Sequence, residues 1–170
     1  MYESKLRYVA LAVFVAAASV PGSGSALDLF ATNISNAAGN CQITDPSSAP
    51  NIRAKALSLD NLGTSGVWIT CGLMSDKTSA GITSLTIALH NQNSVPSTIS
   101  CTAVIGKSSS PAAYYAKSVA IGPGAENQIT WTAAGDGGGI LFPHPASVTC
   151  MLPPNTGITT NEISYAIELI

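Results

Sequence analysis

The side chains best suited to acid–base or metal chemistry are few in this chain. It has two histidines, His90 and His144, and nine carboxylates among 170 residues. A zinc site needs three or four converging ligands, and neither His-x-His nor His-Glu-x-x-His occurs. His90 ends an alternating segment with parity opposite to Leu89, so we expect it to face outward beside a turn. His144 stands between two prolines in an expected loop. We therefore expect no metal site and no cofactor.

The sequence likewise contains no motif that indicates a nucleophilic serine or a catalytic carboxylate. Serine is abundant, but no Gly-x-Ser-x-Gly elbow occurs after residue 26. Asp60, Asp76 and Asp136 all fall in turn signals, where aspartate commonly bonds the nearby backbone. We therefore assign no catalytic residue. Because a triad can assemble from distant positions, a dispersed site of serine, carboxylate and either His90 or His144 stays open as an alternative.

Aromatic side chains offer another kind of chemistry, which is stacking on a ligand. Trp68 has parity opposite to Val67 and Ile69, so it should face away from the core, where a Trp can stack on a sugar ring or anchor a partner. The alternative is a Trp covered by a loop or by the N-terminal lead-in. Tyr114 and Tyr115 are adjacent, so one of them should face outward. Trp68, Tyr114 and Tyr115 are the candidate binding residues.

Four cysteines, Cys41, Cys71, Cys101 and Cys150, provide the clearest structural signal. Three of them end similar phrases, Ile-Thr-Cys, Ile-Ser-Cys and Val-Thr-Cys, whose β-branched and hydroxylated residues are typical of strands. Strand parity places these three sulfurs on the apolar side. Four cysteines allow three connectivities. We favour Cys41–Cys71 and Cys101–Cys150, each closing a loop of roughly 30 to 50 residues and contributing ~4 kcal/mol.

The N-terminus has the layout of a secretory signal peptide. Lys5 and Arg7 precede an apolar run over residues 8–20, and small residues follow up to Ala26. The run is too short for the ~20 residues that cross a bilayer. We expect cleavage after Ala26, a signal peptide over residues 1–26 and a single domain over 27–170, secreted or periplasmic. No later segment predicts a membrane span.

The charge balance narrows the class of partner. Without residues 1–26, five basic and eight acidic residues remain, a formal charge of about −3. The basic residues are scattered rather than clustered. This balance argues against nucleic acid and against anionic membrane surfaces. A glycan or a component of the cell envelope fits better.

Short alternating segments with polar turns between them fill the chain after a lead-in over residues 27–50. We expect about eight or nine strands, with segments at 53–59, 65–73, 83–90, 97–105, 115–121, 126–133, 146–152 and 162–170. No sustained helical periodicity follows the signal peptide. The pattern predicts an all-β fold, an antiparallel jelly-roll-like β-sandwich with two disulfides.

Several phrases together resemble a broad, largely uncharacterised group of small exported bacterial β-sandwich proteins with four cysteine positions. They are Trp-Ile-Thr-Cys at 68–71, Leu-His-Asn-Gln-Asn at 89–93, Ser-Cys-Thr at 100–102, Cys-Met-Leu-Pro-Pro at 150–154 and Ile-Ser-Tyr-Ala-Ile-Glu at 163–168. The chain departs from the pattern at Gly72, where proline is common, and at Glu168, which directly follows Ile167. The resemblance implies the sandwich fold and, less firmly, the cysteine pairing, and it implies no activity.

These observations favour a non-catalytic exported module for binding, adhesion or envelope structure. A small secreted hydrolase is the alternative. An exposed platform of Trp68 and a tyrosine on a flat sheet face would favour binding. A histidine, a carboxylate and a serine clustered within hydrogen-bond reach would favour the enzyme.

Overall fold

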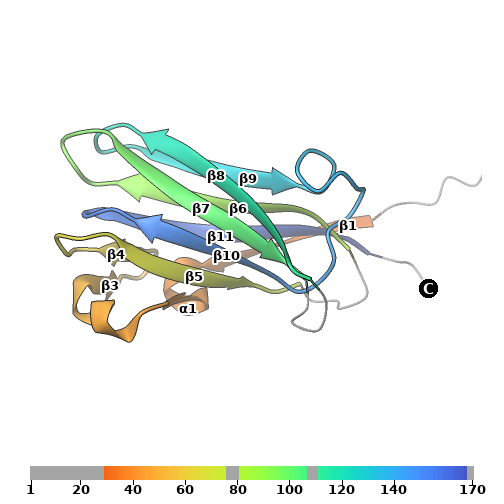
Figure 1. Cartoon of the computed structure of the whole chain (residues 1–170), viewed down its shortest axis with the longest axis horizontal. Coiled ribbons are helices and arrows are strands. Elements are labelled where there is room, and N and C mark those ends of the chain that lie inside the picture. Colours follow the sequence, from red (N-terminus) through yellow and green to blue (C-terminus); the bar gives the residue numbers. More distant parts are fainter. Residues whose placement is uncertain (1–28, 76–80, 107–110, 168–170) are drawn as a thin grey trace, which may run out of the picture.

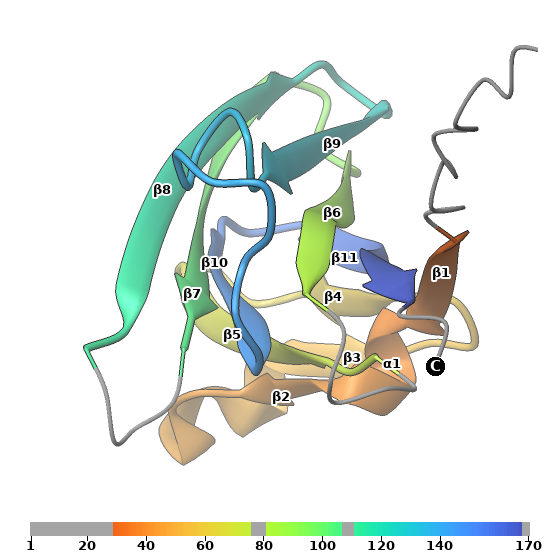
Figure 2. The same ribbon diagram turned by 90° about the vertical axis from the view of Figure 1, so that its right-hand side faces the viewer.

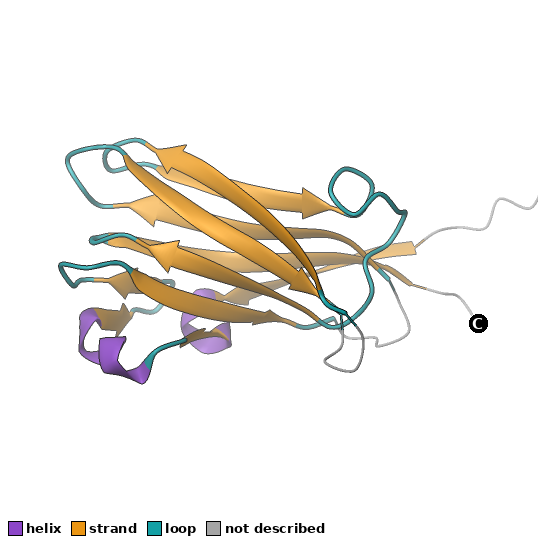
Figure 3. Cartoon of the chain, viewed as in Figure 1, coloured by secondary structure: helices purple, strands orange, loops and turns teal. Residues whose placement is uncertain are grey.

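The computed structural model describes residues 29–75, 81–106 and 111–167, and these form a two-layer β-sandwich (Figures 1 and 3). The expected signal peptide lies outside the described residues. In chain order the elements are β1 Leu29–Asn36, α1 Ala37–Asn40, β2 Cys41–Ile43, the 3₁₀ helix η1 Pro46–Asn51, β3 Ile52–Ala54, β4 Leu59–Asn61, β5 Val67–Leu73, β6 Ile82–Asn91, β7 Ser97–Ile105, β8 Ala113–Ile121, β9 Glu126–Thr132, β10 Ala146–Leu152 and β11 Thr156–Ile167. No helix in these ranges is long and apolar enough to cross a membrane.

The strand order is that of a jelly roll. Sheet A has six strands, in the order β3-β4-β11-β6-β9 with β1 also paired to β11. Sheet B has five strands, in the order β2-β5-β10-β7-β8. Every pairing is antiparallel, and most connections cross from one sheet to the other. The predicted all-β jelly-roll-like sandwich is therefore confirmed.

Strand alternation builds the core between the two sheets. Strand β5 alternates strictly between buried and more exposed positions, and β10 does the same. Trp131 on β9 is fully buried, together with aliphatic side chains from both sheets. Burial of one face of each sheet leaves two outer faces, and any function of the strands must lie there.

Both disulfides lie on the inner side of sheet B and have the favoured pairing. Cys41–Cys71 joins β2 to β5, and Cys101–Cys150 joins β7 to β10. Each bond links residues that stand directly opposite in the strand register, with Cα atoms 3.9 and 4.0 Å apart. Cys71, Cys101 and Cys150 are buried, as strand parity predicted. The bonds therefore staple neighbouring strands of one sheet and do not join the two sheets.

Three segments differ from their sequence-based prediction. The lead-in is not simply extended: β1 pairs along β11, and Asn36 caps the short α1 by accepting from the Ala38 N–H. The single strand expected at 53–59 is two short strands, because the chain turns between Lys55 and Ser58. The closing strand begins at Thr156, earlier than expected. Its expected end at 168–170 lies outside the described residues.

Candidate functional site

Among the described residues, the outer face of sheet B carries no charged side chain. Three rows cross the four long neighbouring strands β5, β10, β7 and β8, and every side chain in them is exposed or half-buried. The rows are Trp68-Met151-Ser100-Ser118, Thr70-Thr149-Thr102-Ala116 and Gly72-Ser147-Val104-Tyr114. We call these twelve residues the neutral face. They are hydroxylated, small or apolar, so the face suits an uncharged ligand.

Hydroxyl groups on this face bond one another across the strands. The Thr70 hydroxyl lies 2.9 Å from that of Thr149 and 3.1 Å from that of Thr44, and Ser100 and Ser118 are 2.8 Å apart. A hydroxyl can donate once and accept twice, so these oxygens keep capacity for further hydrogen bonds. The sheet therefore presents aligned donors and acceptors on a rigid support.

Trp68 is the large aromatic side chain in the first row, and it is 50% exposed. Its strand neighbours Val67 and Ile69 are buried, which confirms the predicted orientation and removes the alternative of a covered Trp. Met151 stands opposite it on β10, and the Met151 sulfur lies 2.6 Å from the position that a Cβ on Gly66 would take. A half-exposed indole beside a thioether offers a broad apolar contact with a free ring face.

The two tyrosines have different positions. Tyr114 is 70% exposed and lies on the neutral face, whereas the neighbouring Tyr115 points inward and packs against Phe142 with ring centroids 5.4 Å apart. The expectation that one of the pair faces outward is confirmed. From Trp68 to Tyr114 is three strand spacings across the sheet and four residues along the strands, which corresponds to roughly 20 Å. The two aromatic rings are therefore separate contact points at opposite corners of the face.

The outer face of sheet A carries the opposite chemistry. One row crosses it as Arg53, Asp60, Gly157, His90 and Glu126. Asp60 is fully buried, and His90 is only 9% exposed. The prediction that His90 faces a solvated turn is therefore wrong. Parity does put it on the outer face, but Gly157 has no side chain, so His90 leans over β11 towards Asp60.

Asp60 is also not the turn residue that the sequence suggested. It lies inside β4, and one carboxylate oxygen pairs with the Lys55 ammonium and accepts from Gln92 at 3.2 Å. Its Oδ1 is 3.1 Å from His90 Nε2. Burial alone would raise the pKa of Asp60, but bonds from Lys55 and Ser58 and the nearby His90 hold it below the ordinary value. We call Asp60, His90, Lys55, Gln92 and Ser58 the Asp60 cluster.

The Asp60 cluster does not have the geometry of a hydrolase triad. His90 Nε2 lies 3.1 Å from Asp60 Oδ1 and 2.8 Å from the side-chain nitrogen of Gln92, so neither of these neighbours of the ring nitrogen is a serine hydroxyl. A triad needs the histidine between the nucleophile and the carboxylate. The nearby hollow of 340 Å³ is lined by Ala88, Glu126, Asn127 and Gln128 and contains no serine. The cluster therefore serves to hold the loop before β4 against sheet A.

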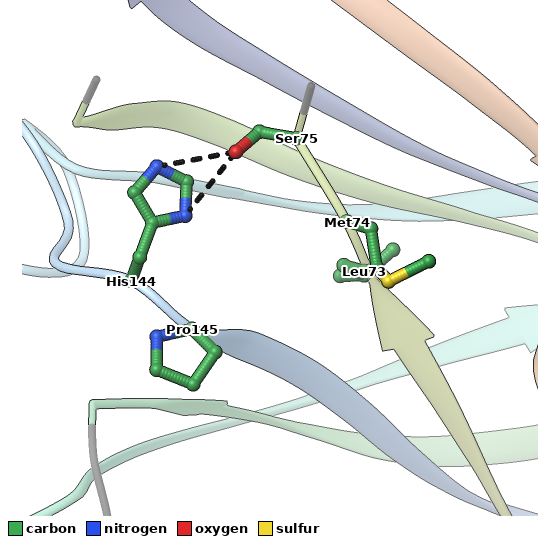
Figure 4. A pocket seen from close by; sticks show the side chains of 5 residues that line it. All are labelled: Leu73, Met74, Ser75, His144 and Pro145. Atoms are coloured by element: carbon green, nitrogen blue, oxygen red, sulfur yellow. Dashed lines mark hydrogen bonds between the residues drawn. The ribbon is translucent and has the colours of Figure 1, made fainter. Parts of the chain in front are cut away.

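His144 meets a serine in a different place, shown in Figure 4. The Ser75 hydroxyl lies 3.5 Å from Nδ1 and 3.4 Å from Nε2, in a pocket of 180 Å³ that Leu73, Met74 and Pro145 also line. An oxygen equally far from both ring nitrogens is poorly placed to give up its proton to either. Among the described residues, no carboxylate pairs with His144. Within the part of the chain that the structure describes, the serine, histidine and carboxylate set of the alternative is therefore incomplete at this pocket.

Two other aspartates were predicted to be turn residues. Asp136 accepts from the Thr132 N–H at 2.8 Å and pairs with Lys117, while Asp76 lies outside the described residues. No group of three potential metal ligands converges within the described ranges. Sequence reasoning missed Met151 and the cross-strand hydroxyls of the neutral face. Their alternation within each strand was visible, but their grouping required the strand order.

Comparisons with known proteins found similar solved structures but no related sequence. No family model and no curated protein matches this chain. An exo-β-1,3-galactanase from Phanerochaete chrysosporium, solved with galactose, aligns over 78% of this chain and 29% of its own, at 10% identity and a TM-score of 0.39. The chain therefore spans less than a third of that enzyme.

Two carbohydrate-binding modules align over more of their own length. A CBM4 structure covers 80% of this chain and 86% of its own, at 12% identity and a TM-score of 0.34. A CBM61 module in complex with β-1,4-galactotriose covers 81% and 88%, at 8% identity and a TM-score of 0.35. Similarity at this level leaves the site to be judged from this chain's own residues.

Proposed function

We propose that this chain is a non-catalytic, exported binding module that holds an uncharged polysaccharide on the neutral face of sheet B. The observation that carries the proposal is the 50% exposure of Trp68 at the edge of a face with no charged side chain. Sugar rings present C–H groups to an aromatic ring and hydroxyls to hydrogen-bonding groups. The neutral face offers both, in rows fixed by the strand register.

An uncharged ligand is favoured because the neutral face carries no charged side chain. An acidic polysaccharide would call for lysine or arginine, and none lies in the three rows of the neutral face. A strongly cationic ligand would call for carboxylates, which the rows also lack. The neutral face therefore gains nothing from charge and should bind with little dependence on salt concentration.

The arrangement also suits an extended ligand. Trp68 and Tyr114 lie at opposite corners, and the hydroxyls of Thr149 and Thr102 lie between them. A single sugar could contact one aromatic ring, whereas a chain of sugars running diagonally could contact both. Affinity should thus rise with chain length until both rings are covered.

The test is a depletion assay on insoluble and soluble polysaccharides. Cellulose, xylan and β-1,4-galactan would be the neutral probes, and alginate the acidic one. We expect binding to at least one neutral probe and at least about tenfold weaker binding by Trp68→Ala, the size of one lost stacking contact. Leu57→Ala removes an exposed apolar side chain from the loop before β4 of sheet A and is the control, expected to bind like wild type.

Two results would reject this function. One is the absence of binding to every neutral probe. The other is equal loss of binding in Trp68→Ala and Leu57→Ala, since only the first lies on the neutral face.

A further inference from the structure

Within the described ranges, one strand edge of this sandwich lacks the protection that the other edges have. Sheet A ends at β3 and β9, and β1 adds another edge beside β11; sheet B ends at β2 and β8. An open edge presents unpaired N–H and C=O groups that can pair with another chain. Natural β-proteins shorten such edges, charge them or cover them. The five edges can be compared on these terms.

Four of the five edges carry such protection. Strands β2 and β3 have three residues each, and β3 includes the exposed Arg53. Strands β8 and β9 lie at the same side of the sandwich and close it with side chains. The Trp131 indole N–H donates to the Tyr115 carbonyl at 2.8 Å, and the Lys117 ammonium donates to the Thr130 carbonyl at 2.7 Å.

Strand β1 has none of these devices. It is eight residues long, with the sequence Leu-Phe-Ala-Thr-Asn-Ile-Ser-Asn, and it contains neither a charge nor a proline. One edge pairs with β11 from end to end. Within the described residues, β11 is the one strand that pairs with β1, so no strand lies along the other edge of β1. Figure 2 shows β1 at the outer margin of the sandwich.

The exposed side chains of β1 favour contact with a partner strand at this edge. Phe30 is 64% exposed and Ile34 is 63% exposed, and both lie on the outer face of sheet A with Thr32 between them. Two large apolar side chains exposed four residues apart on an open edge are a liability in a monomer. A partner strand would cover the backbone groups and the apolar side chains together.

The sequence of β1 complements itself. If two copies pair antiparallel about Thr32, each Phe30 stands opposite Ile34 of the second copy, and Thr32 stands opposite Thr32. This gives two aromatic–aliphatic pairs around a central threonine pair, and both types are favourable across strands. Since no charge lies on the edge, the pairing brings no like charges together. A two-fold contact needs this kind of self-complementary patch.

We propose that two copies of this chain associate through β1, antiparallel about Thr32, so that sheet A runs continuously through the dimer. The neutral face of sheet B stays free in both copies, because it lies on the other layer of the sandwich. The inference does not depend on the proposed function. An unrelated extended peptide could use the same edge, but it would not need the register about Thr32.

The experiment uses protein exported by an expression host, so that natural processing of the N-terminus is kept. Sedimentation velocity over about a hundredfold range of concentration should show a monomer–dimer equilibrium. Thr32→Lys and Thr32→Glu each place like charges face to face at the two-fold axis. Each variant alone should dissociate at concentrations at least about tenfold higher than wild type. Thr98→Lys, at an exposed position of β7 in sheet B, is the matched control and should leave the dimer unchanged.

The decisive step is to mix the two charged variants. Lysine opposite glutamate should restore the dimer, which also shows that neither variant has lost its fold. Wild type that stays monomeric throughout the range would overturn the proposal. Charged variants that dimerise like Thr98→Lys would also overturn it. A mixture that stays monomeric would overturn it too, because the introduced lysine and glutamate would then not stand opposite each other.

Discussion

The two sheets differ in the charge on their outer faces and in the kind of bond that stabilises them. On its outer face, sheet A holds a buried histidine and a buried carboxylate that is paired with Lys55, and it has no disulfide. Sheet B is held by two disulfides on its inner side, and its outer rows carry no charge. Polar groups that stabilise sheet A are used up in internal contacts. Covalent bonds that stabilise sheet B leave its outer hydroxyls and Trp68 available.

Removal of a disulfide should have the largest effect on this comparison. The double variant Cys101→Ser with Cys150→Ser opens a loop with a sequence separation of 49, and Cys41→Ser with Cys71→Ser opens one of 30. In the chain-entropy model these losses are about 4 and about 3.5 kcal/mol. Urea unfolding of both double variants measures them. Losses below about 1 kcal/mol in both would mean that sheet B does not rely on its covalent bonds.

A methyl group at Gly157 should break the sheet A side of the comparison. A Cβ there would lie 2.4 Å from Asp60 Oδ1 and 2.7 Å from His90 Cε1. We expect Gly157→Ala to lose about 2–3 kcal/mol because two packed polar side chains must move. Gly72→Ala is the matched control on sheet B, where a Cβ meets nothing within 4 Å. It should stay within about 0.5 kcal/mol of wild type in thermal unfolding. Equal effects would contradict the close packing over Gly157.

Acid should weaken sheet A through Asp60. The pKa of Asp60 in the folded protein lies below its ordinary value of 3.8, so its contribution is fully present above that value and is lost as the pH falls through the folded pKa. Asp60→Asn should cost about 2 kcal/mol at neutral pH. It should also flatten the decline in unfolding free energy below about pH 4. Urea titrations from neutral pH to pH 3 measure both effects.

An exposed carboxylate provides the control for that experiment. Asp45 is bonded to the hydroxyl and the N–H of Ser47, which lowers its pKa too, but it lies at the surface in the loop before η1. Asp45→Asn should therefore change stability less than Asp60→Asn at neutral pH. The reverse order would remove the Asp60 cluster as the acid-sensitive element.

Trp68→Ala should have the smallest effect on stability. Half of the side chain is already exposed, so we expect a loss of about 1 kcal/mol or less in urea unfolding. Tyr114→Ala, at the far corner of the same face, should lose no more. A loss above about 3 kcal/mol for Trp68→Ala would indicate a core residue and would weaken its assignment as a contact residue.

Strand parity predicted the parts of this molecule that depend on single strands. The outward Trp68, the inward Cys71, Cys101 and Cys150, and the sandwich itself all follow from alternation between core and solvent. Parity could not predict the burial of His90. That burial depends on Gly157, which lies 67 residues away along the chain and becomes a neighbour only because β11 is inserted between β4 and β6.

The candidate site divides in the same way. The exposed aromatic residue could be named from its strand, because exposure depends on local alternation. The hydroxyl rows could not, because Thr70, Thr149 and Thr102 come from three strands that meet only in the folded sheet. The sequence suggested a joint platform of Trp68 and a tyrosine, but the strand order separates Trp68 from Tyr114.

Collisional quenching of tryptophan fluorescence tests the central claim most directly, because the chain has two tryptophans, and Trp131 is fully buried while Trp68 is half exposed. Acrylamide should therefore quench Trp68 and leave Trp131 largely untouched. A saturating neutral polysaccharide from the depletion assay should reduce the quenching in wild type and in Leu57→Ala, because the sugar chain covers Trp68. Binding of that polysaccharide without any protection of Trp68 would contradict the assignment of the neutral face as the contact surface.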